Sequence, residues 1–136
     1  NAVLGLSQLK KLNKNISNRQ KNLNLWLSIL NNSEFYTEFS INGNSSFALP
    51  IILKNKDVKL KKQVCKTLDD LKVEYRLGTA GGGNLARQPF IKKYKHKIVD
   101  DQKNVNHIHD FGLYVGNGSH IDEKSITFVG QKLTNL

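Results

Sequence analysis

Residues 73–90 read VEYRLGTAGGGNLARQPF, which joins a predicted strand directly to a glycine-rich loop. The strand runs from Val73 to Leu77, and the loop after it combines flexible backbone with a carboxamide, a guanidinium and a proline. Glycine lets backbone N–H groups approach a ligand closely, and the planar fork of Arg87 suits a phosphate or a carboxylate. Loops of this kind usually bind ligands, but composition alone equally permits a flexible turn whose arginine is solvated.

Residues 1–30 are predicted to form one long amphipathic helix, because apolar residues recur at helical spacing without an interrupting proline. At the helical rise this helix would be ~45 Å long, which is more than a compact domain of this size needs. We therefore expect it to reach a further domain or a partner subunit. Its apolar stripe consists of Ala2, Leu6, Leu9, Ile16, Leu23, Leu27 and Leu30.

Two strands and a second helix are predicted between this helix and the loop. Residues 39–41 form the first strand, and residues 47–54 form the second, which is dense in apolar and β-branched side chains. Pro50 has no N–H, so the second strand lies at a sheet edge or has its proline near one end. Asp57 is placed to cap the helix. The inner face of that helix carries Leu60, Val64, Leu68 and Leu71.

After the loop, the pattern predicts two more helices around a short strand. Asn104 is expected to cap a helix near residues 105–111, and Gly112 to take the left-handed position that follows it. Residues 113–115 form a buried strand, and Asp122 caps the last helix. Ile126, Val129 and Leu133 line the inner face of this helix. Together these elements predict an α+β fold in which helices cover a small antiparallel or mixed sheet.

The chain has 136 residues and a formal net charge of +10, which would attract polyanions. Most of its cations are lysines, with Arg19, Arg76 and Arg87 the only arginines, whereas sequence-specific nucleic-acid readers rely on arginine for bidentate base contacts. No helix-turn-helix, zinc-finger or aromatic RNA-binding motif accompanies the charge. We therefore do not expect nucleic acid as a partner. A stand-alone basic module that binds nucleic acid or another polyanion is the alternative function.

The cysteine count and the apolar segments indicate the cellular compartment. Cys65 is the single cysteine, which excludes an intrachain disulfide, and its helical position predicts a buried structural thiol. No apolar run approaches membrane-spanning length, and we expect the cytoplasm as the compartment. The sequence begins at Asn1 and contains no methionine, so we expect it to be an excised or processed piece of a longer chain.

Motifs for catalysis or metal binding are absent from the sequence. His107 and His109 are two residues apart, so on a helix they face different directions and we expect no metal site. The segment around Ser119 lacks the GxSxG pattern of a hydrolase. The glycine run is neither a Walker loop nor a GxGxxG motif that opens a helix. The residues themselves therefore assign no catalytic group.

Three segments resemble, in the same order, parts of the DegT-type family of pyridoxal-phosphate-dependent sugar enzymes. Residues 1–12, NAVLGLSQLKKL, resemble the helix that opens the family's C-terminal domain. Residues 83–90, GNLARQPF, resemble its GN-x-x-RQP loop, and residues 108–117, IHDFGLYVGN, resemble its closing helix–strand motif. The resemblance implies that residues 1–136 form a single domain, the C-terminal small domain of a larger fold-type I enzyme whose large N-terminal domain is absent here.

The resemblance also implies a chemistry. The loop is most similar to that of the branch that dehydrates nucleotide-linked 4-keto-6-deoxyhexoses at C3, while relatives with a similar C-terminal domain are sugar aminotransferases. Both make deoxysugars or aminosugars for surface polysaccharides such as lipopolysaccharide. Pyridoxal phosphate (PLP) is the implied cofactor, with the lysine or histidine base in the missing domain, so we expect no catalysis by this chain alone and no covalent PLP on it. The choice between the two chemistries, the sugar and the nucleotide stay open.

The same resemblance implies site residues and partners. Arg87 would present its fork to a phosphate or nucleotide diphosphate, and the alternative is that it pairs with a local carboxylate and only holds the loop. We expect the N-terminal PLP domain, a nucleotide-sugar substrate and a second copy in a homodimer as partners, and no membrane. The loop residues expected near substrate or cofactor are Gly83, Asn84, Arg87 and Gln88, with Asn117 and His120 as candidates for a second contact.

Overall fold

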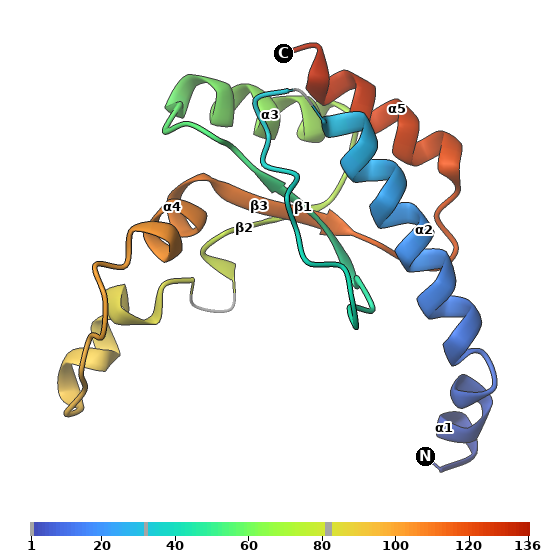
Figure 1. Cartoon of the computed structure of the whole chain (residues 1–136), viewed down its shortest axis with the longest axis horizontal. Coiled ribbons are helices and arrows are strands. Elements are labelled where there is room, and N and C mark those ends of the chain that lie inside the picture. The colour runs from blue at the N-terminus through green and yellow to red at the C-terminus, as the bar shows by residue number, and fades with distance from the viewer. Residues whose placement is uncertain (1, 32, 81–82) are drawn as a thin grey trace.

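The computed structural model describes residues 2–31, 33–80 and 83–136, and it shows an α+β fold built on three strands (Figure 1). The strands are β1 (Ala48–Ile52), β2 (Tyr75–Leu77) and β3 (Gly112–Gly116). The helices are α1 (Ala2–Leu9), α2 (Leu12–Leu30), α3 (Val58–Asp70), α4 (Lys103–Phe111) and α5 (Glu123–Thr134), and the 3₁₀ turns are η2 (Leu85–Arg87) and η3 (Pro89–Lys93).

The sheet is antiparallel, with strand order β1-β3-β2. Pro50 pairs with Tyr114 in the middle of β1, and Arg76 of β2 pairs with the same Tyr114 from the other side. β1 is therefore an edge strand, which confirms the placement predicted from the proline. An edge tolerates proline because no neighbouring strand needs its missing N–H.

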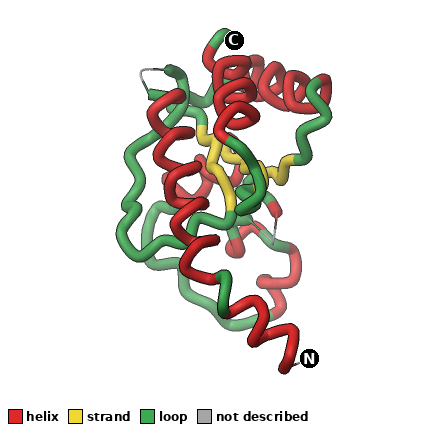
Figure 2. Tube along the Cα trace, turned by 90° about the vertical axis from the view of Figure 1, so that its right-hand side faces the viewer, coloured by secondary structure: helices red, strands yellow, loops and turns green. Residues whose placement is uncertain are grey.

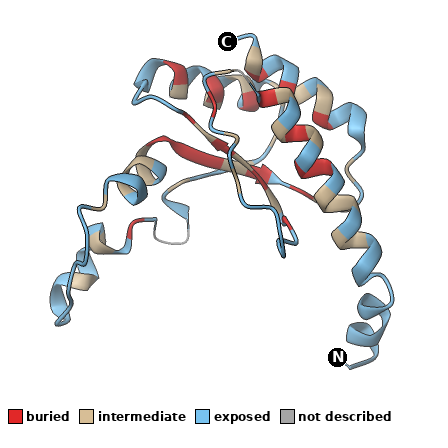
Figure 3. Cartoon of the chain, in the orientation of Figure 1, coloured by how far each residue is buried: buried red, intermediate tan, exposed pale blue. Residues whose placement is uncertain are grey.

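One face of the sheet is covered by α2, α3 and α5, and the core lies between them (Figure 3). Alternate residues of the strands point into this core, as the period of a strand requires. On α2 the Trp26 side chain is buried, and its Nε1–H donates to the carbonyl of Pro50 at 2.8 Å. The core residues of the strands and of the three helices include Leu23, Leu30, Leu49, Ile51, Val64, Leu68, Leu113, Val115, Ile126 and Leu133.

The first helix differs from the prediction, because residues 1–30 do not form one continuous helix. Lys11 N–H donates to Gln8 at 3.0 Å, a three-residue turn that tightens the chain before α2 begins. No described residue of α1 is buried, and Figure 2 shows α1 extending beyond the rest of the molecule. Helices of this length depend on tertiary packing of their apolar face, and no contact of that kind holds α1 in line with α2.

The predicted strand at residues 39–41 is also wrong. The segment that meets β1 lies earlier, where Phe35 forms an isolated bridge with Leu53 and the Tyr36 N–H donates to Ile52 at 2.7 Å. Pairing ends there because Pro50 has no N–H and its carbonyl already accepts the Trp26 indole N–H. At Pro50 the outer edge of β1 therefore offers neither group to a further strand.

Two of the predicted helix caps are confirmed. Asp57 accepts the Leu60 N–H at 2.8 Å and Asp122 accepts the Ser125 N–H at 2.7 Å. The cap of α4 is not Asn104, because the helix begins earlier, after Gln102 in the left-handed conformation (φ 53°). Lys103 N–H is bound by the Asp101 carboxylate at 3.0 Å, which draws the helix start toward that residue.

Two further predictions need correction near the core. Gly112 is extended (φ −99°) rather than left-handed, because the chain passes directly from α4 into β3. Residue 112 has room only for glycine, because a Cβ there would lie 2.5 Å from the carbonyl oxygen of Ile108. Cys65 is half-buried at the core's margin, not fully buried, and its thiol is hydrogen-bonded with Tyr75 of β2.

Candidate functional site

The RQP loop, defined as residues 83–90, follows β2 and lies against α4 (Figure 1). The Gly78 N–H donates to the carbonyl of Gly112 at 2.6 Å, so the segment leaving β2 stays beside the start of β3. The loop then forms η2 and η3, which Pro89 separates by beginning the second turn. Proline suits the first position of such a turn because its N–H would be unpaired there.

Asn84 ties the loop together and is buried, with 3% of its surface exposed. Its Nδ2 donates to Gln102 Oε1 at 3.1 Å and to Asn106 Oδ1 at 2.8 Å, while its Oδ1 accepts the Ala86 N–H at 3.0 Å. Both amide hydrogens and the carbonyl are therefore used within the protein. These bonds give Asn84 a structural role in the loop, and its predicted contact with substrate or cofactor stays a prediction.

Gly83 takes a left-handed conformation (φ 56°), and a Cβ there would collide with Nδ1 of His109. The adjacent Asn84 N–H donates to that same Nδ1 at 2.9 Å. An accepting Nδ1 carries no proton, so the imidazole is neutral with its hydrogen on Nε2. The close backbone approach that glycine permits is thus made to the His109 ring.

Arg87 pairs with a carboxylate of α4. Its Nη1 lies 2.9 Å from both Oδ1 and Oδ2 of Asp110, and each side chain keeps over two-fifths of its surface exposed. Lys61 of α3 also reaches this point, because its Nζ donates to the Asp110 backbone carbonyl. The ion pair matches the alternative in which Arg87 holds the loop. Binding of an anion by Arg87 stays a prediction, since a ligand would have to share or displace Asp110.

One face of α4 makes all of these contacts. Asn106, His109 and Asp110 lie along one side of this helix, and Gln102, the residue just before it, completes the set. Sequence reasoning assigned none of the four to the loop. The available signal was this run of polar side chains at helical spacing, close after a loop that has no carboxylate of its own. Gln88 lies between the two 3₁₀ turns and donates its N–H to Leu85 at 3.1 Å.

Asn117, one of the two residues predicted to make a second ligand contact, lies at the end of β3 away from the RQP loop. Asn117 follows that strand and is 1% exposed, and its Nδ2 donates to the carbonyls of Arg19 and Ser46 at 2.9 and 2.8 Å. Its Oδ1 accepts from Asn22 Nδ2 at 3.0 Å. The length of β3 therefore separates Asn117 from the RQP loop. The Asn117 carboxamide instead links the end of β3 to α2.

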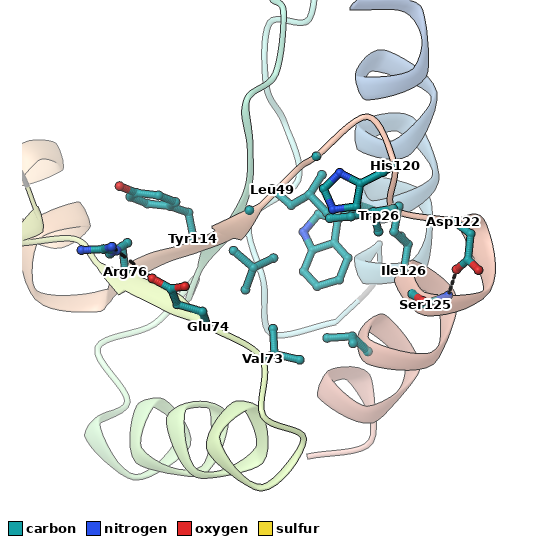
Figure 4. Close-up of a pocket in the computed structure, with 15 residues that line it drawn as sticks. Trp26, Leu49, Val73, Glu74, Arg76, Tyr114, His120, Asp122, Ser125 and Ile126 are labelled. Atoms are coloured by element: carbon teal, nitrogen blue, oxygen red, sulfur yellow. Dashed lines mark hydrogen bonds and ion pairs between the residues drawn. The ribbon is translucent and has the colours of Figure 1, made fainter. Parts of the chain in front are cut away.

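His120 is exposed and borders a hollow of about 900 Å³ (Figure 4). Its walls are largely apolar and include Trp26, Leu49 and Ile126, with the ion pair of Glu74 and Arg76 on one side. At the start of α5, the Ser125 N–H lowers the pKa of the Asp122 carboxyl. His120 and Asn117 thus do not converge on the RQP loop, and the described loop residues do not line this hollow.

Two absences among the described residues bound the chemistry further. No group of three histidine, cysteine or carboxylate side chains among them is arranged to hold one metal ion. Within the same residues, none of the helices has the length and apolarity to cross a bilayer.

The sequence of residues 1–134 matches the model of the DegT/DnrJ/EryC1/StrS aminotransferase family. The chain belongs to this family. The resemblance inferred from the RQP loop and its flanking segments is thereby confirmed, over nearly the whole chain.

Curated relatives in this family are much longer than the chain. It is 28% identical over 119 residues to the lipopolysaccharide biosynthesis protein RfbH of Salmonella typhimurium, which covers 85% of the chain and 27% of that protein. It is 28% identical over 116 residues to GDP-4-keto-6-deoxy-D-mannose 3-dehydratase of Escherichia coli O55:H7, covering 85% of the chain and 30% of the relative. The chain therefore spans less than a third of these relatives.

Solved structures share the fold. An E. coli GDP-4-keto-6-deoxy-D-mannose 3-dehydratase with bound hydrated PLP superposes with a TM-score of 0.82 at 24% identity, over 96% of the chain and 33% of that protein. The Helicobacter pylori aminotransferase PseC, of pseudoaminic acid biosynthesis, superposes with a TM-score of 0.73 at 16% identity, over 97% of the chain and 36% of that protein. At these identities the likeness shows the fold.

Proposed function

We propose that the chain is the C-terminal small domain of a PLP-dependent enzyme that acts on a nucleotide-linked 4-keto-6-deoxysugar, and that it walls the active site. The observation that carries the proposal is the family match over residues 1–134. Within that span, hydrogen bonds hold the RQP loop against α4. The large domain that would complete the enzyme corresponds to the part of the relatives that the chain does not span.

The residues around the RQP loop do not fit PLP by themselves. PLP enzymes pair a lysine imine with a charged partner for the pyridine nitrogen. Three charged side chains meet here: Arg87 and Asp110 are paired with each other, and the Lys61 ammonium is bound to the Asp110 backbone carbonyl. We therefore assign the cofactor to the missing domain, where it would act as the electron sink. This chain contributes the shape and position of the wall, which orients the substrate and excludes water.

Removal of the C3 hydroxyl is the reaction we assign. The 28% identical relatives include a protein named as a 3-dehydratase, whereas the PseC aminotransferase superposes at 16% identity. Products of such an enzyme enter deoxysugars of surface polysaccharides, in keeping with the name of the Salmonella relative. We place the enzyme in the cytoplasm as a homodimer, and the exposed apolar face of α1 supports an interface with another domain or subunit.

The test uses the longest natural polypeptide that carries this chain, given PLP, ¹⁵N-glutamate and a GDP-linked 4-keto-6-deoxyhexose. A 3-dehydratase yields a sugar that has lost its C3 oxygen and carries no label, which mass spectrometry and NMR distinguish. An aminotransferase places ¹⁵N on the sugar. A polypeptide that binds PLP but changes neither atom contradicts the proposed substrate, and one that does not bind PLP contradicts the proposed function.

Binding of a polyanion is the second candidate, because every residue from Lys92 to Asp100 is exposed and four of them are lysines. Its test is the affinity of the chain for a polynucleotide between 50 and 200 mM salt. Each phosphate contact steepens the logarithmic salt slope by roughly 0.9 for duplex DNA. A steep slope favours this function, whereas binding that is weak and saturates at no defined stoichiometry counts against it.

A further inference from the structure

The contacts between the RQP loop and α4 are of two kinds. Asn84 and Arg87 contact Gln102 and α4 through their side chains, the first buried and the second partly exposed. His109 is different, because its Nδ1 accepts a hydrogen bond from the backbone N–H of Asn84 at 2.9 Å. A bond to the backbone limits where the loop can lie, since the N–H direction follows the local φ and ψ angles.

The shape of the loop at Gly83 reinforces this contact. Gly83 has a φ of 56°, and its missing Cβ leaves the space into which the His109 ring fits. The ring and the backbone of residues 83–84 are therefore complementary in shape as well as in hydrogen bonding. His109 sits on the same helix face as Asp110, the partner of Arg87.

We propose that His109 is the positioning residue of the RQP loop. Its neutral imidazole holds the backbone at Asn84, and this brings Arg87 to the edge of α4 where it meets Asp110. The positioning follows from the geometry of the chain itself. Its consequence for turnover rests on the proposed function, in which the loop walls the active site.

Three variants separate this role from general packing. His109→Asn keeps an acceptor, because the Asn Oδ1 can occupy the place of the imidazole Nδ1, and His109→Leu keeps bulk but has no acceptor. His107→Asn is the matched control: His107 lies on the same helix but contacts the Leu53 carbonyl and stacks on Phe111, away from the loop.

The first measurement is hydrogen exchange of the Asn84 amide in the chain, with the Leu113 amide of β3 as the reference for global stability. We expect exchange at Asn84 to be about tenfold faster in His109→Leu than in the wild type, and restored in His109→Asn, with Leu113 unchanged. Unchanged exchange at Asn84 in His109→Leu would overturn the proposal. Faster exchange at both Asn84 and Leu113 would also overturn it, because that result indicates a general loss of packing. Equally fast exchange at Asn84 in His107→Asn would overturn it as well.

The second measurement needs no variant. Long-range ¹H–¹⁵N correlation of the wild-type His109 ring reports which nitrogen carries hydrogen, and the proposal requires an unprotonated Nδ1 at neutral pH. A hydrogen on Nδ1 overturns it, even if His109→Leu does not fold. Neither measurement involves substrate, so failure of the proposed enzyme activity would leave both results standing, and failure of the positioning would leave the activity assay unaffected.

Discussion

Arg87 Nη1 lies 2.9 Å from both carboxylate oxygens of Asp110, so one guanidinium nitrogen joins the RQP loop to α4. The pair is well exposed, and exposed ion pairs contribute about 0–1 kcal/mol to stability. Its effect on the fold is therefore small. Its effect on ligand binding can be larger, because a bound anion and Asp110 would compete for the same cation.

Two substitutions at this pair give opposite results if Arg87 binds an anionic substrate. Arg87→Lys keeps the charge but loses the planar fork, and we expect kcat/KM of the complete enzyme to fall by about 1–3 kcal/mol in transition-state free energy. Asp110→Asn removes the competitor, and we expect substrate affinity to be kept or increased. Steady-state kinetics and the melting temperature are the measurements. Unchanged kinetics with a lowered melting temperature in both variants would assign the pair to holding the loop alone.

Asn117→Ala is expected to lower the free energy of unfolding by about 1–3 kcal/mol. The substitution leaves the carbonyls of Arg19 and Ser46 and the amide of Asn22 without the partners that Asn117 supplies. Denaturant unfolding measures the loss. Asn104→Ala is the control, because Asn104 is exposed on α4, and we expect it to change stability by less than about 0.5 kcal/mol. Equal effects of the two substitutions would refute the structural role of Asn117.

Gly112→Ala is expected to destabilise the protein by about 1–3 kcal/mol, because the new Cβ would lie 2.5 Å from the Ile108 carbonyl oxygen and α4 or β3 would have to shift. Gly116→Ala is the matched control in the same strand: a Cβ there meets nothing within 4 Å. Thermal melts of the two variants should differ clearly. If Gly112→Ala melts like Gly116→Ala, the close approach of α4 to β3 is wrong.

Stability should fall as the pH rises from 10 to 12. A hydrogen bond with the Cys65 thiol, followed by burial, raises the pKa of Tyr75 from 10.0 to about 12. The unfolded chain then loses this proton first, so over that window it binds fewer protons than the folded chain and the free energy of unfolding decreases. Tyr75→Phe should show a shallower decrease in urea unfolding across the window, whereas Tyr94→Phe, at an exposed tyrosine, should keep the wild-type slope. A Tyr75→Phe slope equal to that of the wild type would contradict the shifted pKa.

The apolar face of α1 is expected to drive self-association of the chain at high concentration. Val3, Leu4, Leu6 and Leu9 are each more than 60% exposed, and faces of this kind mark interfaces. Leu6→Lys combined with Leu9→Lys should shift sedimentation toward the monomer. Ser7→Lys combined with Gln8→Lys adds the same charge on the same helix at polar positions and should shift it less. A wild-type chain that stays strictly monomeric at high concentration would exclude this interface.

Local chemistry allowed the sequence to predict much of the fold. Asp57 and Asp122 cap their helices through N–H groups only three residues away, so their side chains need no distant partner. Pro50 limits its strand to a sheet edge because the missing N–H belongs to the residue itself. The RQP loop was recognised for the same reason, since its residue types are adjacent in the chain, and its family followed from them.

The tertiary structure alone decided which partners within the protein these residues have. Asn84 and Arg87 are expected near a ligand from the sequence, which stays a prediction, and the fold adds their hydrogen bonds to α4, about twenty residues later. Asn117 is bonded to Arg19, 98 residues earlier, and the Trp26 indole N–H occupies the Pro50 carbonyl, a contact that only the fold creates. Whether a polar side chain faces a ligand or its own protein depends on which partners reach it first. Partners far along the chain are brought close only when the hydrophobic core packs α2, α3 and α5 on the sheet.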